Sequence, residues 1–149
     1  MAETLGSLCD KLTIIKLKQW HSKDLKRLKS LAIQEKQLQD EINEFVCAAI
    51  AKQITLEKLT FASNKIYKKK GNAVADIQGS IGEVFSQLAT VNCQLWHEQE
   101  KVYEFEKVPA SEKDTVVKRL ALFNLKRNKC IDEIDRQFVN AIKQLHTRT

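Results

Sequence analysis

Two Trp-His pairs are the side chains whose chemistry the sequence offers first. Trp20-His21 ends a segment that begins at Gly6, and Trp96-His97 ends a looser copy that begins at Gly79. An imidazole titrates near neutral pH, so two of them facing one pocket would form a pH-sensitive binding site. In the alternative, which we prefer, each tryptophan packs between helices and each histidine covers the rim of that packing.

A second set of candidates falls at predicted helix starts and helix middles. The segment 7–10, Ser-Leu-Cys-Asp, fits a capping box, so Asp10 already has a local role and a ligand-binding role needs further support. Asn92 and Asn128 occupy helix interiors, where asparagine is a poor helix former. A buried asparagine could fix the register of neighbouring helices or face a ligand, and both interpretations stay open. The candidate ligand-binding residues are Asp10, Lys11, Trp20, His21, Asn92, Trp96, His97, Arg127 and Asn128.

Two carboxylate pairs raise the question of metal chemistry. Glu41 with Glu44, and Asp132 with Asp135, are each spaced to share one helix face, as magnesium-binding pairs do in helical nucleotide pyrophosphatases. Neither pair has a partner motif nearby and both lie among basic residues, which favours exposed helix charges. No metal, cofactor or catalytic residue is predicted, and the sequence leans against an enzyme without excluding one.

The cysteines are widely spaced. They are Cys9, Cys47, Cys93 and Cys130. None belongs to a Cys-x-x-Cys pair, so a zinc site is not expected, and a domain of this size needs no disulfide framework. Small buried thiols on helices are predicted.

The elements that must position these side chains are helices. Only four glycines and one proline occur in 149 residues, and apolar residues recur at three- and four-residue spacing. The patterns predict four main helices. The first starts at Ser7, the second follows a break near 30–33 and ends at 68–71, the third starts at Ser80, and the last starts at Ser111.

An internal repeat sets the predicted fold. A shift of 76 residues places Gly6 on Gly82 and superposes the two Trp-His pairs. We therefore predict an all-α protein, a four-helix bundle built from two pseudo-repeated antiparallel helical hairpins. The predicted repeats span about 5–70 and 79–147 of a single domain that covers 1–149.

The charge of the chain is moderately basic. Lysine and arginine outnumber aspartate and glutamate by 25 to 19, and these cations could neutralise phosphates. Residues 73–110, however, carry six acids against two bases, and no alternation of aromatic and basic residues marks a stacking surface. A nucleic-acid partner is not expected. The outer surface of the third helix is predicted to be acidic, and it could instead complement basic charge within the chain or between subunits. Its carboxylates are Glu83, Glu98, Glu100, Glu104 and Glu106.

Membrane and export signals are not evident in the sequence. No apolar run approaches the ~20 residues that a transmembrane helix needs. The N-terminal residues Met-Ala-Glu-Thr-Leu-Gly lack the basic and apolar regions of a signal peptide. We therefore predict a cytoplasmic protein without a transmembrane segment.

Three motifs resemble those of a family of small helical bacterial proteins of unknown function. Residues 6–14, 91–97 and 123–128 resemble the family's opening, central and third motifs. The acidic pair that usually follows the central motif is replaced here by Gln99-Glu100. The resemblance covers most of the chain except about 30–78. Such proteins are commonly encoded beside glycosyltransferase and lipopolysaccharide genes, so the resemblance implies a cellular context rather than a chemistry.

The expected function is that of a non-catalytic accessory or interaction protein in bacterial surface-glycan assembly. The resemblance makes a glycosyltransferase the candidate partner, and association into a homo-oligomer is a further option. A second interpretation is a small enzyme or nucleotide-sugar-binding protein with its site in a groove between helices. A third is a basic module that binds nucleic acid or an anionic membrane surface.

Overall fold

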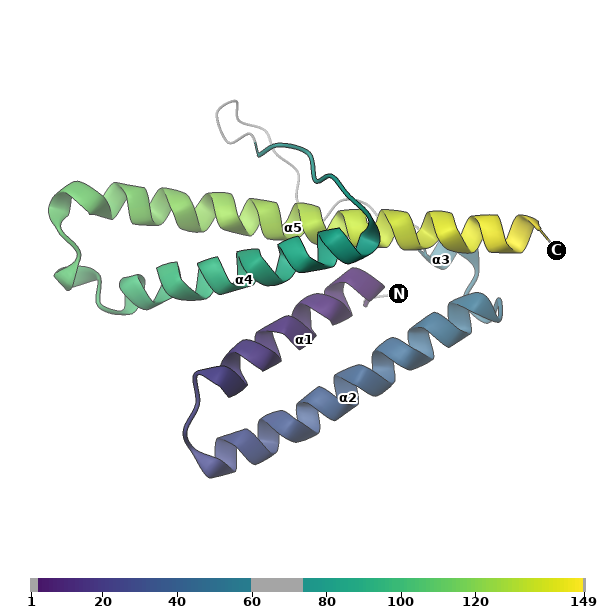
Figure 1. The fold of residues 1–149 in the computed structure, drawn as a ribbon, viewed down its shortest axis with the longest axis horizontal. Coiled ribbons are helices and arrows are strands. Elements are labelled where there is room, and N and C mark those ends of the chain that lie inside the picture. The colour runs from purple at the N-terminus through teal and green to yellow at the C-terminus, as the bar shows by residue number, and fades with distance from the viewer. Residues whose placement is uncertain (1–2, 60–73, 149) are drawn as a thin grey trace.

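The computed structural model describes residues 3–59 and 74–148, and every regular element within these ranges is helical (Figure 1). The elements are α1 (Leu5–Trp20), α2 (Leu25–Ile50), the short α3 (Leu56–Leu59), α4 (Ile81–Tyr103), the 3-10 turn η1 (Phe105–Lys107) and α5 (Ala110–Thr147). The predicted all-α class is confirmed. None of the helices in these ranges is both long enough and apolar enough to cross a bilayer.

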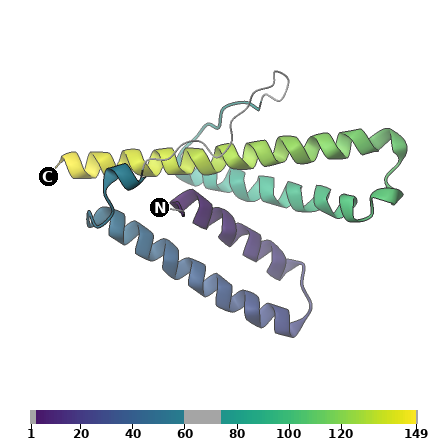
Figure 2. The same cartoon turned by 180° about the vertical axis from the view of Figure 1, so that it is seen from behind.

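The helices form two antiparallel hairpins. In one hairpin α2 runs back along α1, and in the other α5 runs back along α4 (Figures 1 and 2). Helix α1 lies against both α4 and α5, whereas α2 packs mainly on α1. The turns of both hairpins lie at the same end of the molecule, and the hairpins diverge toward that end (Figure 1).

The hydrophobic core lies at the end opposite the two turns, where all five α-helices meet. Its buried members are Leu5, Leu8 and Cys9 of α1, Phe45 and Ala49 of α2, Leu59 of α3, Val84 and Leu88 of α4, and Cys130, Ile131, Ile134 and Ile142 of α5. The core residues of α1 and α4 come from the first halves of those helices, and those of α2 and α5 come from their second halves. The hairpin tips therefore project beyond the core.

Helix α1 begins three residues earlier than the sequence predicted. Thr4 is the N-cap, and its hydroxyl accepts the amide of Ser7 at 3.0 Å while the Ser7 hydroxyl accepts the amide of Thr4 at 2.8 Å. The capping box is therefore Thr4 with Ser7, and the prediction of Ser7 with Asp10 is wrong. This correction frees the Asp10 carboxylate for a contact elsewhere.

The break between the first two helices lies at residues 21–24, and the prediction of 30–33 is wrong. Asp24 caps α2, because its carboxylate accepts the amides of Lys26 and Arg27 at 2.9 and 3.3 Å. An N-cap aspartate stops one helix and starts the next without glycine or proline. Leu31, inside the predicted break, is a buried residue of α2.

Helix α2 ends at Ile50, earlier than predicted, in a C-terminal cap that uses lysine where glycine is usual. Lys52 has φ of 61°, in the left-handed region. The amide of Gln53 donates to the carbonyl of Ala48 at 2.9 Å, and that of Lys52 to Ala49 at 3.3 Å, the two bonds of a Schellman motif. The predicted helix end at 68–71 lies outside the described residues.

The starts of the two later helices differ in how well the sequence predicted them. Ser80 is the N-cap of α4 and accepts the amide of Glu83 at 3.4 Å, which confirms the prediction. Helix α5 begins at Ala110, directly after Pro109, whose carbonyl accepts the amide of Glu112 at 2.8 Å. Ser111 therefore lies inside the first turn, and its predicted role as N-cap is wrong.

Candidate functional site

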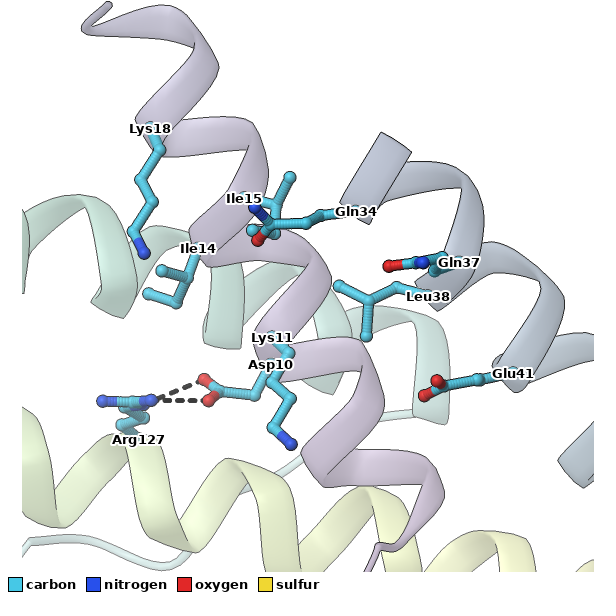
Figure 3. A pocket seen from close by; sticks show the side chains of 10 residues that line it. All are labelled: Asp10, Lys11, Ile14, Ile15, Lys18, Gln34, Gln37, Leu38, Glu41 and Arg127. Carbon is cyan, nitrogen blue, oxygen red and sulfur yellow. Dashed lines mark hydrogen bonds and ion pairs between the residues drawn. The ribbon is translucent and has the colours of Figure 1, made fainter. Parts of the chain in front are cut away.

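Asp10 of α1 and Arg127 of α5 form a bidentate ion pair between the hairpins (Figure 3). Arg127 Nε donates to Asp10 Oδ1 at 2.9 Å, and Nη2 donates to Oδ2 at 2.5 Å. Asp10 is 5% exposed, whereas Arg127 is half-buried. The hydrogen bonds to Asp10 raise the pKa of Arg127 above its ordinary value, so the guanidinium stays charged.

Asn92 of α4 joins this pair from the side. Its Nδ2 donates to Asp10 Oδ1 at 2.9 Å and to Thr13 Oγ1 at 2.7 Å, while the Thr13 hydroxyl donates to the carbonyl of Asp10 at 2.7 Å. We call these four residues, Asp10, Thr13, Asn92 and Arg127, the polar clasp. It links α1, α4 and α5 at the border between the core and the hairpin tips.

One buried polar atom of the clasp lacks a hydrogen-bond partner within the described parts of the chain. Asn92 is 1% exposed, and its Oδ1 has no hydrogen-bond partner among the described residues. Leaving a buried carbonyl unpaired costs about 1–3 kcal/mol. The amide cannot simply be turned over, because its oxygen would then face the carboxylate of Asp10. The ion pair and the two bonds from Nδ2 therefore offset the cost of this orphaned oxygen.

A cavity of about 440 Å³ opens between α1 and α2 beside the clasp (Figure 3). It is lined by Asp10, Lys11, Ile14, Ile15, Lys18, Gln34, Gln37, Leu38, Glu41 and Arg127. The isoleucines and the leucine give it an apolar wall, and the lysines and Arg127 add positive charge. A cavity of this size is typical of small-molecule sites.

The structure gathers only some of the predicted site residues. Asp10, Asn92 and Arg127 share the clasp, and Lys11 lines the cavity beside them and pairs with Glu3. Thr13 was not among the predicted residues, although its position three residues after Asp10 places both on one helix face. Asn128 donates its Nδ2 to the carbonyl of Asn124 at 2.7 Å, so its amide bonds within α5.

The two Trp-His pairs lie in different surroundings, so their predicted equivalence is wrong, and so is the prediction that Trp20 packs between helices. Trp20 is 85% exposed at the end of α1, whereas Trp96 is half-buried in α4 and donates Nε1 to Glu100 at 3.0 Å. The ring of His21 stacks on Trp96, with centroids 4.9 Å apart and planes 10° apart. His97 is exposed. The pairs differ because the first one ends its helix, while α4 continues past the second.

The first turn of α1 packs directly on α5. The amide of Gly6 donates to Asp135 Oδ1 at 2.7 Å, so the carboxylate satisfies one of the free amides at the helix start. Asp135 is partly buried, and burial raises the pKa of its carboxyl above its usual value of 3.8. The prediction that Asp132 and Asp135 form an exposed pair is therefore wrong for Asp135.

Asp135→Asn is expected to stabilise the protein at neutral pH. A raised native pKa means that the folded state binds the proton more readily than the unfolded chain, so the stability of the wild type rises as the pH falls through that pKa. Asparagine keeps an acceptor for Gly6 without the buried charge. The advantage of the variant should shrink on acidification, as measured by urea unfolding across pH. Asp114→Asn, an exposed change on α5, controls for net charge, and a less stable Asp135→Asn at neutral pH would contradict the interpretation.

Two further sequence predictions need correction. Cys9 and Cys130 are buried thiols as predicted, and burial raises the pKa of Cys9 to about 12, but Cys47 and Cys93 are exposed. Glu98 was predicted to belong to an acidic outer surface of the third helix. It is only 5% exposed and contacts Lys101 at 3.1 Å and Arg119 at 3.6 Å. Lys101, three residues later on α4, and Arg119 of α5 therefore cover the Glu98 carboxylate, which the sequence had placed at the surface.

Within the described residues no group of three or more histidine, cysteine, aspartate or glutamate side chains is placed to hold a metal ion. The arrangement that the structure does present is a clasp of mutually bonded polar groups next to an amphipathic cavity. Compared with known proteins, the chain matches no family model, no curated protein and no solved structure.

Proposed function

We propose that the protein is a non-catalytic interaction protein. The observation that carries this proposal is the polar clasp, in which both oxygens of Asp10 accept bonds from Arg127 and Oδ1 also accepts from Asn92. A general base or nucleophile must reach its substrate, and Asp10 is only 5% exposed. Because the carboxylate is committed to two other helices, its role is to fix the hairpins relative to one another.

The biological setting in this proposal comes from the three sequence motifs. Their resemblance to helical bacterial proteins encoded beside glycosyltransferase genes supports a cytoplasmic role in surface-glycan assembly, with a glycosyltransferase as partner. Two clasp residues, Asp10 and Arg127, belong to the first and third motifs, and Asn92 belongs to the central one. A shared need to hold the hairpins together would account for all three motifs at once.

Duplication of a hairpin is a further part of the proposal. In each hairpin a shorter helix precedes a longer one, with 16 and 26 residues in α1 and α2 and 23 and 38 in α4 and α5. The shared order supports an ancestral pair packed into a four-helix bundle. The different surroundings of the Trp-His pairs mean that any such copies have since diverged in use.

The cavity favours one alternative, a protein that binds a nucleotide sugar. Lys11, Lys18 and Arg127 could meet a diphosphate, while Ile14 and Leu38 could cover a ring. The carboxylate of Glu41, on the opposite wall, would repel the diphosphate. Arg127 is moreover already held by Asp10, so the alternative depends on the two lysines.

Two measurements on the purified protein separate these functions. Co-elution with a surface-glycan glycosyltransferase in size-exclusion chromatography is expected, and failure to form a complex would contradict the proposal. Thermal-shift screening with uridine and guanosine diphosphate sugars is expected to give no stabilisation. A shift of several degrees that Lys11→Ala with Lys18→Ala abolishes would establish the nucleotide-sugar alternative instead.

A further inference from the structure

The turn between α1 and α2 exposes large apolar side chains. Trp20, at the end of α1, is 85% exposed, and Leu25, at the start of α2, is 75% exposed. Ile33 follows two turns later on the same face of α2 as Leu25 and is 61% exposed. The core lies at the other end of the hairpins, so these residues do not serve the packing of the fold.

The same turn concentrates positive charge. Residues 16–29 contain six lysines and arginines and a single carboxylate, Asp24, while the whole chain has a net charge of +6. Lys16 pairs with Glu35 of α2 at 3.1 Å. Within residues 3–59 and 74–148, no carboxylate forms an ion pair with the other five cations. These are Lys18, Lys23, Lys26, Arg27 and Lys29.

The turn of the other hairpin has the opposite charge. Residues 98–114 contain six carboxylates and three lysines. Because the two hairpins diverge toward this end (Figure 1), the two tips are separate, and the basic tip can meet an anionic surface without the acidic one. The separation of charge between the tips would orient the molecule on such a surface.

We propose that the α1–α2 tip, defined as Trp20, Leu25, Ile33 and the five cations, docks onto an anionic phospholipid bilayer. Tryptophan favours the headgroup region, since its ring is apolar and its N–H is polar. Leu25 and Ile33 would enter the acyl boundary, and the cations would pair with anionic headgroups. A nucleic acid could use the cations and the tryptophan ring, but it offers nothing to two exposed aliphatic side chains. This inference is independent of the proposed glycosyltransferase partner.

Flotation of the full chain with lipid vesicles tests this docking. Binding is expected to equimolar phosphatidylcholine and phosphatidylglycerol vesicles, and not to pure phosphatidylcholine vesicles. Trp96→Phe leaves Trp20 as the sole tryptophan, and its fluorescence should shift to the blue on binding. Trp20→Ala should weaken binding about tenfold or more while leaving thermal unfolding unchanged, because the side chain is exposed.

Two double variants distinguish binding through the α1–α2 tip from binding through the overall positive charge of the protein. Lys26→Gln with Arg27→Gln is expected to weaken vesicle binding by a factor of about ten or more. Lys118→Gln with Lys143→Gln removes the same charge from exposed positions of α5 and should change binding little. Equal losses in the two double variants, no binding, or a Trp20 spectrum that does not shift would each overturn the proposal. Tighter, Trp20-dependent binding to a mixed oligonucleotide would assign the tip to nucleic acid instead.

Discussion

Gly6→Ala is expected to destabilise the protein by about 2 kcal/mol, although alanine is the better helix former. A Cβ at Gly6 would lie 2.5 Å from the carbonyl oxygen of Ile131 and 3.0 Å from Asp135 Oδ1. The carbonyl belongs to the backbone of α5 and cannot rotate away, so α1 must move off α5. That movement would also weaken the bond between the Gly6 amide and Asp135, which is 2.7 Å long.

Gly82→Ala is the matched control, because Gly82 is the second residue of α4 as Gly6 is the second residue of α1. No described atom outside its own turn lies within 4 Å of a Cβ built at Gly82. This variant is therefore expected to gain up to about 1 kcal/mol from helix propensity alone. Urea unfolding followed by circular dichroism measures both changes. A Gly6→Ala variant that is as stable as the wild type, or more stable, would show that α1 does not approach α5 as closely as described.

Arg127→Met is expected to destabilise the protein by about 2–3 kcal/mol. The substitution leaves the carboxylate of Asp10, which is 5% exposed, without its cationic partner. Removing one member of a buried ion pair costs about 3–5 kcal/mol, and the smaller figure allows for the 32% exposure of the Arg127 side chain. Methionine preserves much of the aliphatic stem, so the loss reports mainly on the charge.

Arg136→Met provides the comparison on the same helix. Arg136 pairs with Glu133 three residues earlier, and its side chain is 60% exposed. Exposed pairs of this kind contribute about 0–1 kcal/mol, so this variant should unfold at nearly the wild-type urea concentration. If Arg127→Met tolerates as much urea as Arg136→Met, the clasp does not stabilise the fold.

The sequence predicted the fold class and several buried positions, because apolar periodicity reports directly on helix faces. The predicted helix ends were wrong where a residue other than glycine or proline ends a helix. Lys52 ends α2 in the backbone conformation that usually signals glycine, and Asp24 separates two helices without a breaker. At the start of α1, Thr4 and Ser7 both have side chains that can cap a helix, and the structure uses Thr4 as the N-cap.

Part of the candidate site could also be predicted. Asn92 stood out as a poor helix former inside a helix, and the structure places it in an interhelical contact, in agreement with the register interpretation. Asp10 and Arg127 were among the candidate residues, but their bonds could not be derived from the sequence, because Asp10 lies 82 positions from Asn92 and 117 positions from Arg127. The repeat, in contrast, predicted a similarity that the structure does not have. Gly6 and Gly82 are aligned in the sequence, but Gly6 lies in a tight contact with α5 and Gly82 faces open space.

The most direct test of the account is a double-mutant cycle between Asp10→Leu and Arg127→Met, measured by urea unfolding. The clasp predicts that the double variant loses at least about 1.5 kcal/mol less than the two single losses combined, because removing both charges leaves neither one buried alone. Losses that add to within about 0.5 kcal/mol would mean that the two side chains do not interact, and that the hairpins are held together without the clasp.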